Sequence, residues 1–380
     1  MTFVIKPYPE FGWSISRQRK LDRCPRAYFY HYYLGWNGWL DDAPRERRLA
    51  YRLSKLTSLD ALLGQEVDAR ARELEAAARA GSALPAAEEL EAHTRTSLRQ
   101  VWARAKKGRP AFEARPKQVT MLRSLYLRHD TRPETERLDE KVGPSMRGLL
   151  ATSHWERLRG RGAEGVVEVP DFAHFFWAGV KVYAAPDLAY VHDDVLHVVD
   201  WKSGREEATD PTQVLLQMWW ALETYPAPAR AAAAGGLEVR GHLEYVTAGR
   251  TRPVEVAAGS GPIGPGGAGL AVDDLREACI ETVRAGVARM RALLADPEEN
   301  IPLAESAFER REGGLWRATI VGAGGREEIA ARAIVNAAGP WVADVLATTD
   351  AKPSNASVRH VKGSHIVVPE ALSGLPSKGS

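Results

Sequence analysis

Short apolar runs broken by polar pairs occupy the middle of the chain. Residues 188–192 form one such run, Asp193 and Asp194 interrupt it, and residues 195–202 form the return run. Two β-strands joined by a two-residue turn have this pattern. The stretch therefore predicts a β-hairpin, with the two aspartates at its turn.

Helices are predicted on both sides of this hairpin. Apolar residues recur with helical spacing over residues 59–80 and stop at Gly81, and residues 83–148 are largely helical in pattern. Beyond the hairpin, helices are predicted over residues 212–225 and from about residue 273 to residue 294. Helices before and after a strand pair predict an α/β protein.

Further strands would widen the sheet around the hairpin. Alternating apolar residues predict strands over 166–169 and 175–183, which lead into it. A second hairpin is predicted from residues 237–246 with residues 253–256. Residues 258–269 are rich in Gly and Pro and predict a flexible loop.

The register of the first hairpin brings two acids together. If His192 faces Val195, Asp187 faces Asp200, and like charges in directly opposed positions destabilise a sheet. A divalent cation would neutralise them, and carboxylate oxygens suit Mg²⁺ or Mn²⁺. The alternative is a solvated, Asp-rich turn.

Lys202 lies two residues beyond Asp200, so both side chains leave one face of the strand, while Trp201 faces away. An ion beside an ammonium group suits phosphodiester hydrolysis. The ion polarises the phosphoryl oxygen and activates water, and the ammonium stabilises the developing charge. In the alternative, Lys202 merely flanks a Ser-Gly turn.

Pro186-Asp187 followed by Asp200-Trp201-Lys202 resembles the signature of the PD-(D/E)XK nuclease superfamily, in its RecB-like and Cas4-like branch. The resemblance implies a restriction-endonuclease-like mixed sheet flanked by helices, with an N-terminal helical lobe. It also implies hydrolysis of DNA with Mg²⁺ or Mn²⁺. Asp187, Asp200 and the backbone carbonyl of Trp201 would hold the metal, and Lys202 would orient water or stabilise charge.

The resemblance extends to two helices. Gly64-Gln-Glu-Val-Asp68 places Asp68 where these nucleases usually have a histidine near the metal, so Asp68 is a candidate ligand. The alternative for Asp68 is a surface carboxylate on an Arg-rich helix. Gln213 matches the glutamine of the helix that follows the motif strand and is a candidate to hold water or a phosphate oxygen. Gln217 lies one turn further on the same face and is a candidate contact for nucleic acid.

Residues 11–40 are basic and aromatic. Ser14 or Ser16 would cap a helix through Leu21, and a second helix is predicted from Pro25 to Leu34. The aromatic rings and nearby arginines could stack bases and bind phosphates, or the rings could form a packing face. The arginines concerned are Arg17, Arg19, Arg23 and Arg26.

The same stretch resembles the N-terminal motif of Cas4-like nucleases, Ser-x-Ser before Cys-Pro-Arg-x-Tyr. In that family the cysteine often joins three C-terminal cysteines on an iron–sulfur cluster. Here the chain has only Cys24 and Cys279, so no cluster is expected and Cys24 is predicted to be a small buried side chain.

Composition agrees with a globular protein. The 380 residues are 44% hydrophobic and 26% charged, with no apolar run of membrane-spanning length and no signal-peptide pattern, so a cytoplasmic protein is expected. The net charge is +2, but residues 1–60 carry +5 and residues 101–164 carry +7. Such local excess suits a phosphate-bearing partner, although solvated helix faces often look the same.

The sequence changes character near residue 311. Strands are predicted over residues 315–321 and 331–336. Asn336-Ala-Ala-Gly-Pro-Trp341 and Lys362-Gly-Ser-His-Ile-Val-Val-Pro369 resemble an internal piece of an FAD-dependent glycerol-3-phosphate dehydrogenase. The expected division is a nuclease-like domain over 1–310 and a dehydrogenase-like fragment over 311–380, joined by fusion or truncation.

FAD binding is not expected of this fragment, because Gly322-Ala-Gly-Gly325 lacks the spacing and the following helix of a dinucleotide fingerprint. The main hypothesis is a metal-dependent DNA nuclease serving DNA repair, with a helicase or other DNA-processing protein as possible partner and no membrane. A second hypothesis is a catalytically weak member of the same fold that binds nucleic acid. The third is an FAD-dependent dehydrogenase fragment.

Overall fold

The computed structural model describes residues 6–161, 166–193, 195–224, 238–254, 272–308, 316–322 and 325–331. Contacts between residues divide the chain into two compact units, Met1–Arg310 and Arg311–Ser380. The candidate site and the predicted sheet lie in the first unit.

A four-stranded mixed sheet lies at the centre of the first unit, in the order β4-β5-β6-β7. β4 (Leu188–His192) and β5 (Val195–Trp201) are antiparallel, with His192 opposite Val195, so the predicted hairpin is confirmed. β6 (Glu238–Tyr245) runs parallel to β5, and β7 (Arg250–Val254) pairs antiparallel with β6. The second predicted hairpin therefore extends the sheet as expected, and its second strand begins earlier in the chain.

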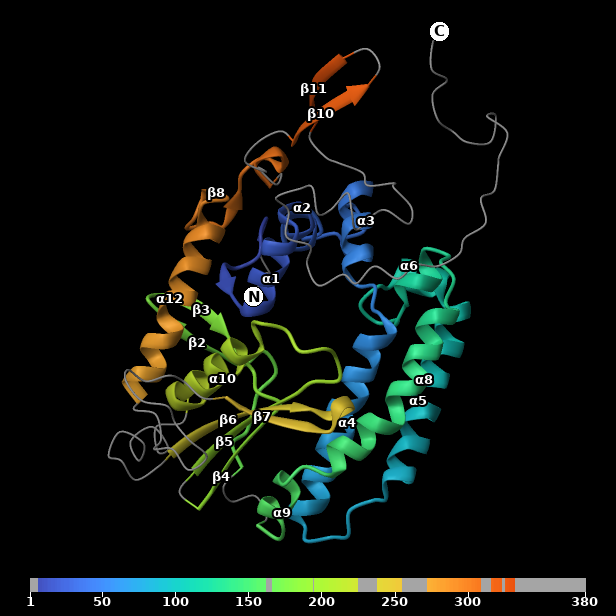
Figure 1. Ribbon diagram of the computed structural model, residues 1–380, viewed down its shortest axis with the longest axis vertical. Coiled ribbons are helices and arrows are strands. Elements are labelled where there is room, and N and C mark those ends of the chain that lie inside the picture. Colours follow the sequence, from blue (N-terminus) through green and yellow to red (C-terminus); the bar gives the residue numbers. More distant parts are fainter. Residues whose placement is uncertain are drawn as a thin grey trace. The chain divides into compact units, whose positions relative to one another are not determined.

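Helices cover both faces of this sheet (Figure 1). The connection from β5 to the parallel β6 contains α10 (Asp210–Thr224), which packs on both strands and on α12 (Val272–Arg291). α4 (Leu59–Arg79) packs on β5 from the other side. Strands covered on two faces are apolar on both, and six of the seven residues of β5 are buried. The predicted α/β fold with a mixed sheet flanked by helices is confirmed.

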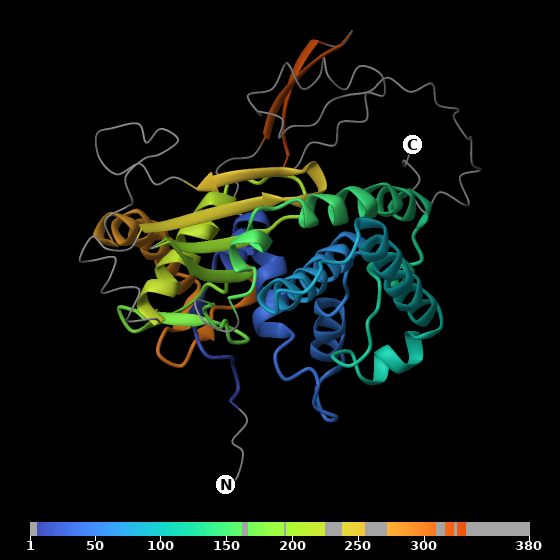
Figure 2. The same cartoon turned by 90° about the horizontal axis from the view of Figure 1, so that it is seen from below.

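The helical lobe lies to one side of the sheet (Figure 2, blue to green). α4 is capped by Ser58, whose hydroxyl accepts a hydrogen bond from the Ala61 amide. Its predicted end is confirmed, because Gly81 follows with a φ of 68°, which favours glycine. The other helices of the segment are α3 (Arg45–Ser54), α5 (Ala87–Lys107), α6 (Arg109–Ala114), α7 (Arg123–Tyr126), α8 (Arg132–Leu150) and α9 (His154–Leu158).

The N-terminal segment folds nearly as predicted. Ser14, not Ser16, caps α1 (Ile15–Arg23) by accepting from the Arg17 amide. The second predicted helix is divided into α2 (Pro25–Phe29) and a turn of π-helix, η1 (Tyr30–Leu34). Sequence periodicity does not reveal such a change of winding.

Two strand predictions before the hairpin are wrong in detail. Residues 175–183 form a hairpin of β2 (His174–Trp177) and β3 (Val180–Tyr183), since Ala178 and Gly179 adopt positive φ and turn the chain. Val166 makes only an isolated bridge to Tyr190, so residues 166–169 are not a strand. β1 (Gly12–Trp13) pairs with β3 and completes a small three-stranded sheet.

The first unit ends in β8 (Leu294–Asp296), β9 (Ile301–Pro302) and the short η3 (Glu305–Phe308).

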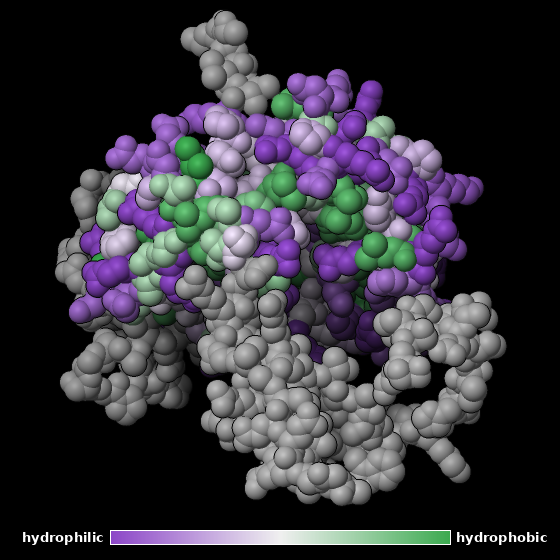
Figure 3. All heavy atoms as spheres, turned by 90° about the horizontal axis from the view of Figure 1, so that it is seen from above, coloured by the Kyte–Doolittle hydropathy of each residue, from purple (hydrophilic) through white to green (hydrophobic). Residues whose placement is uncertain are grey.

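On one face of the molecule, apolar side chains gather near the middle and polar side chains surround them (Figure 3). No helix among the described residues is long and apolar enough to cross a membrane.

In the second unit, β10 (Trp316–Gly322) and β11 (Gly325–Ala331) form an antiparallel hairpin. The predicted strand over 315–321 is confirmed. The strand expected over 331–336 is wrong at its start, because Ala331 ends β11. The rest of that expected strand lies outside the described residues. The predicted loop over 258–269 also lies outside them.

Candidate active site at the end of strand β5

Asp200 lies at the end of β5 and is 2% exposed. α10 covers this face of the strand and supplies two amides to the carboxylate. Gln213 Nε2 donates to Asp200 Oδ1 at 2.8 Å, and Gln217 Nε2 donates to the same oxygen at 2.9 Å. The two glutamines are four residues apart and therefore lie on one face of the helix. The local fold thus fixes one oxygen of Asp200 in place.

Lys202 completes this arrangement. Its Nζ lies 2.6 Å from Asp200 Oδ2 and donates to Gln213 Oε1 at 3.1 Å. Asp200, Lys202 and Gln213 therefore form a closed ring of contacts between strand and helix. The Lys202 side chain is 19% exposed, so this ammonium group reaches the solvent side of the buried carboxylate.

Asp187 approaches from the first strand of the hairpin. Its Oδ2 accepts a hydrogen bond from the Trp201 amide at 2.8 Å. Asp187 as a whole residue is exposed, because it lines a cavity. Its carboxyl group is nevertheless surrounded by protein atoms. Burial raises the pKa of Asp187 well above its ordinary value, and the charges of Asp200 and Asp68 raise this pKa further. The two motif acids therefore lie close enough to repel each other.

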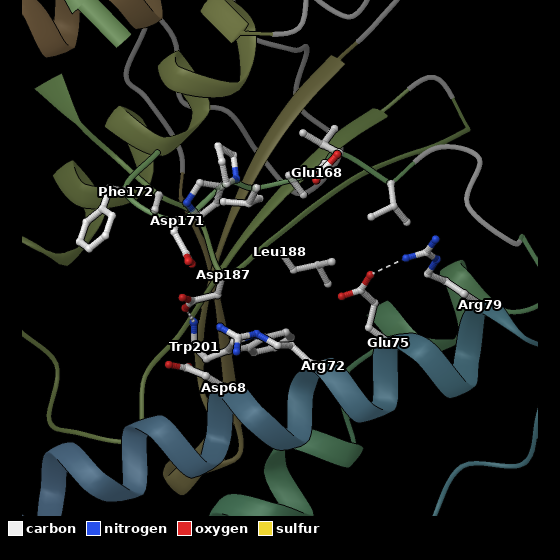
Figure 4. A pocket seen from close by; sticks show the side chains of 17 residues that line it. Asp68, Arg72, Glu75, Arg79, Glu168, Asp171, Phe172, Asp187, Leu188 and Trp201 are labelled. Carbon is white, nitrogen blue, oxygen red and sulfur yellow. Dashed lines mark hydrogen bonds and ion pairs between the residues drawn. The ribbon is translucent and has the colours of Figure 1, made fainter. Parts of the chain in front are cut away.

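A cavity of about 600 Å³ opens beside Asp187. Helix α4 forms one wall with Asp68 and Arg72, and the Asp68 and Asp187 side chains both reach its interior (Figure 4). Burial raises the pKa of Asp68, Arg72 opposes this shift, and Asp200 adds to it. Asp68 is therefore a neighbour of the motif acids, not a carboxylate remote from them.

These residues fit a hard divalent cation. Three carboxylates lie near one another, and two of them have raised pKa values, the response expected where a compensating charge is missing. Oxygen donors suit Mg²⁺ or Mn²⁺. The site is not preorganised for an ion, because among the described residues Asp68, Asp187 and Asp200 do not offer three ligand atoms within 4.8 Å of one another. An ion would also compete with Lys202 for Asp200 Oδ2.

Most of the candidate DNA-binding arginines contact protein groups. Arg17 donates to the Gly12 carbonyl oxygen and lies over the Tyr32 ring. Arg19 forms an ion pair with Asp210. Arg26 forms an ion pair with Glu305. Arg23 is exposed. Arg17 and Arg19 are thus structural in this conformation.

The aromatic residues of this segment form a packing face. Tyr28 and Tyr33 are 2% and 3% exposed, and both rings contact Phe308 at the end of the first unit. The packing alternative therefore holds for these two rings, because stacking with bases requires an open ring face.

Two predictions about side chains are wrong. Gln217 is 1% exposed and donates to Asp200 and to the Ala185 carbonyl oxygen, so it is not available to contact nucleic acid. Cys24 is exposed instead of buried, because it caps α2: its Sγ accepts from the Ala27 amide. Burial applies instead to Cys279, which is 0% exposed.

A second polar cluster, which sequence reasoning missed, lies on the other face of β5. His154 of α9 contacts Glu244 of β6, and His242 lies beside them; all three are buried. Desolvation lowers the pKa of His242 to about 2 and that of His197 to about 3. A His-x-Glu pattern in a predicted strand was the available signal, but its partner is 90 residues away in sequence.

Comparison with known proteins assigns the first unit. The family model of the PD-(D/E)XK nuclease superfamily matches residues 12–308, which include the hairpin, α4 and α10. The chain belongs to the PD-(D/E)XK nuclease superfamily. No solved structure matches the chain.

Shorter matches relate part of the chain to dehydrogenases. It is 48% identical over 67 residues to D-erythritol 1-phosphate dehydrogenase of Brucella abortus, covering 17% of this chain and 13% of that protein. It is 42% identical over 66 residues to glycerol-3-phosphate dehydrogenase of Pseudomonas aeruginosa, with the same two shares. The match to aerobic glycerol-3-phosphate dehydrogenase of Escherichia coli is 34% over 92 residues, covering 24% of this chain and 18% of that protein. The chain spans less than a fifth of each of these relatives, and the partial matches agree with the resemblance of one segment to a dehydrogenase.

Proposed function

We propose that this chain is a metal-dependent DNA nuclease of the RecB-like and Cas4-like branch. The observation that carries the proposal is the ring formed by Asp200, Lys202 and Gln213 beside Asp187. It places an acid, an ammonium group and an amide beside Asp187, which lines the cavity. These groups have the chemistry that phosphodiester hydrolysis requires.

Each residue has a role in this proposal. Asp187 and Asp200 hold the cation, with the Trp201 carbonyl oxygen and Asp68 as further ligands. Lys202 stabilises the charge that develops on the phosphate or orients the attacking water. Gln213 holds Lys202 and Asp200 in their relative positions and would hold the attacking water or a phosphate oxygen. The Mg²⁺ or Mn²⁺ ion would polarise the phosphoryl oxygen and lower the pKa of its water.

DNA is the substrate we propose, since the flanking segments supply positive charge and an exposed aromatic ring lies at the cavity. Arg72 lines the cavity, and Phe172 at its rim is 82% exposed. An exposed ring beside an arginine suits stacking with an unpaired base. The positive balance of residues 1–60 and 101–164 points the same way. A cytoplasmic protein that works with a helicase or another DNA-processing partner remains part of this proposal.

The test is cleavage of labelled single-stranded and duplex DNA with Mg²⁺ or Mn²⁺, comparing wild type with Asp200→Ala and Lys202→Ala. Both variants should lose cleavage. Asp130→Ala is the matched control, because Asp130 is an exposed carboxylate paired with Arg132 far from the hairpin in sequence. Cleavage that persists in Asp200→Ala at the wild-type rate would contradict the proposal.

A second candidate is a catalytically weak member of the fold that binds nucleic acid. It is favoured by Asp68 in the place of the usual histidine and by the engagement of both Asp200 oxygens with protein groups. Metal-dependent DNA binding without cleavage, by wild type as well as by the variants, would support this candidate over the first.

For residues 311–380 we propose an appended segment that takes no part in cleavage. The contact division after Arg310 and the short dehydrogenase matches support this view. Limited proteolysis should cut between residues 305 and 315, and the digested protein should still cleave DNA. FAD chemistry is not proposed; a purified protein with flavin absorbance would overturn that choice.

A further inference from the structure

Three buried side chains from two distant segments bring ligand atoms together behind the candidate active site. One ligand atom each from His154, His242 and Glu244 lies within 4.8 Å of the other two. His154 comes from α9, and the other two come from β6, where alternate residues share one face. Their exposed fractions are 1%, 8% and 3%.

A second layer of contacts orients these side chains. Tyr190 OH lies 2.7 Å from His154 Nδ1, so the other ring nitrogen, Nε2, faces Glu244 Oε1 at 2.9 Å. Thr251 Oγ1 donates to Glu244 Oε2 at 2.7 Å and leaves Oε1 directed to the cluster. Partners that occupy the second atom of each ligand are typical of metal sites, because they fix the tautomer and the ring orientation.

His242 has a similar partner on the neighbouring strand. Its Nε2 lies 2.9 Å from His197 Nδ1, and the two rings are stacked with centroids 5.1 Å apart. Three ligands held in this way are preorganised without the ion. The His197 ring extends the cluster along β5.

The surroundings are apolar and exclude water. Trp155 and Trp201 stack at 5.6 Å, and the His154 ring contacts Trp201 at the same centroid distance. A carboxylate in such a site is costly unless a cation neutralises it. Glu244 has His154 as its only ion-pair partner among the described residues, so a bound cation would add a neutralising charge beside this carboxylate.

We propose that His154, His242 and Glu244 bind a divalent transition-metal ion, of which Zn²⁺ is the best fit, as a structural site. Two imidazoles and one carboxylate suit Zn²⁺ better than Mg²⁺, which prefers oxygen ligands. The ligand atoms lie within 4.8 Å of one another and would move to Zn²⁺ bond lengths of about 2.0–2.2 Å. On binding, the ion replaces the proton shared by His154 and Glu244, and that proton is released.

This site is separate from the proposed nuclease centre. Trp201 and His197 leave the opposite face of β5 from Asp200, so the strand itself lies between the two groups. The ion would join α9 of the helical lobe to β6 of the sheet. Its role would be to hold these elements together and not to contact the substrate.

The test measures bound metal in the full-length protein. Protein stripped with a chelator is given Zn²⁺ in the presence of excess Mg²⁺, dialysed and analysed by atomic emission. Wild type should retain one equivalent of Zn²⁺, and the double variant His154→Gln with His242→Gln should retain less than about a tenth of it. Asp200→Ala is the control for the nuclease centre and should retain one equivalent. Loss of the ion in Asp200→Ala, or retention in the double variant, overturns the proposal.

A spectroscopic measurement on wild type keeps the test decisive if the double variant does not fold. Co²⁺ added to stripped, folded wild type should give visible d–d bands with the intensity of a four- or five-coordinate site, and Zn²⁺ should abolish them. The absence of such bands overturns the proposal without any variant. This outcome is also independent of whether the protein cleaves DNA.

Discussion

The two faces of strand β5 carry polar residues in opposite settings. On the face toward α10, Asp200 contacts Lys202, whose ammonium group is partly exposed. On the face toward α9, the buried His197 stacks on Tyr190 and His242. A single alternating strand therefore supports one polar group that opens to solvent and one that does not.

The difference shows that solvent access decides what similar polar residues can do. Polar groups beside an accessible cavity retain the ability to bind ions and substrate, at the cost of local repulsion between carboxylates. Enclosed polar groups must satisfy one another, so they link the elements from which they come. Substitutions on the open face should affect activity as well as stability, and those on the enclosed face should affect mainly stability.

The largest expected effect is on the open face. If the proposed function holds, Lys202→Met should lower the rate of DNA cleavage by about 10²–10³-fold, since in that proposal its charge stabilises the transition state. Its free energy of unfolding should also fall, by about 3 kcal/mol, because the variant leaves the buried Asp200 carboxylate without its cation partner. Cleavage kinetics and urea unfolding measure the two quantities. Lys141→Met, which removes a surface lysine paired with Asp60, should leave the rate unchanged.

On the enclosed face, Trp201→Ala should lower the free energy of unfolding by about 3–5 kcal/mol, because the ring is 6% exposed and stacks on Trp155. Urea denaturation followed by circular dichroism measures the loss. Trp39→Ala, at a ring that is 46% exposed, should cost markedly less. Equal losses at the two positions would show that the enclosed face has no special part in stability.

The pH dependence of stability separates the two faces further. The pKa of His242 falls to about 2 and that of His197 to about 3 in the folded protein, so below about pH 6.5 the unfolded state binds more protons. Stability should therefore fall as the pH decreases through this window, by up to about 1.4 kcal/mol per pH unit for each histidine. The raised pKa values of Asp187 and Asp68 act in the opposite direction, since the folded state takes up protons first.

Urea unfolding in the presence of a chelator, from about pH 7 to about pH 5, tests this expectation. His242→Gln removes one of the two histidines and should make the dependence less steep than in wild type. An unchanged slope would mean that His242 is not buried in its neutral form.

The smallest expected effect concerns Asp68. Asp68→Asn should raise the Mg²⁺ concentration for half-maximal cleavage by about tenfold, because one carboxylate near the ion is lost. Asp60→Asn, on the same helix but exposed, should have no such effect. A metal titration of the cleavage rate distinguishes them. Identical titrations for Asp68→Asn and wild type would exclude Asp68 as a ligand.

Sequence reasoning located the hairpin and the helices around it because their signals are local. Period-two alternation and a two-residue interruption suffice to predict the pairing of His192 with Val195. The helix with Gln213 and Gln217 was also predictable, but not that Gln217 would be buried against Asp200. Which side of a helix packs on the sheet depends on the tertiary fold.

Other features depend on contacts that periodicity does not encode. Ala178 and Gly179 turn the chain within what reads as one continuous strand, because a positive φ at a non-glycine residue leaves no sequence signal. The His154 cluster joins residues about 90 positions apart. Such assemblies become visible only when the helix and the strand are placed together.

Gly148 sets how closely α8 approaches the segment after β6. A β-carbon at this position would lie 1.9 Å from the Val246 carbonyl oxygen, so any larger residue would push the helix outward. α8 also packs against α4, the helix that carries Asp68. The absence of a side chain at Gly148 thus allows α8 to pack directly against the backbone of Val246. A larger residue at position 148 would therefore also disturb the packing of α8 on the helix that carries Asp68.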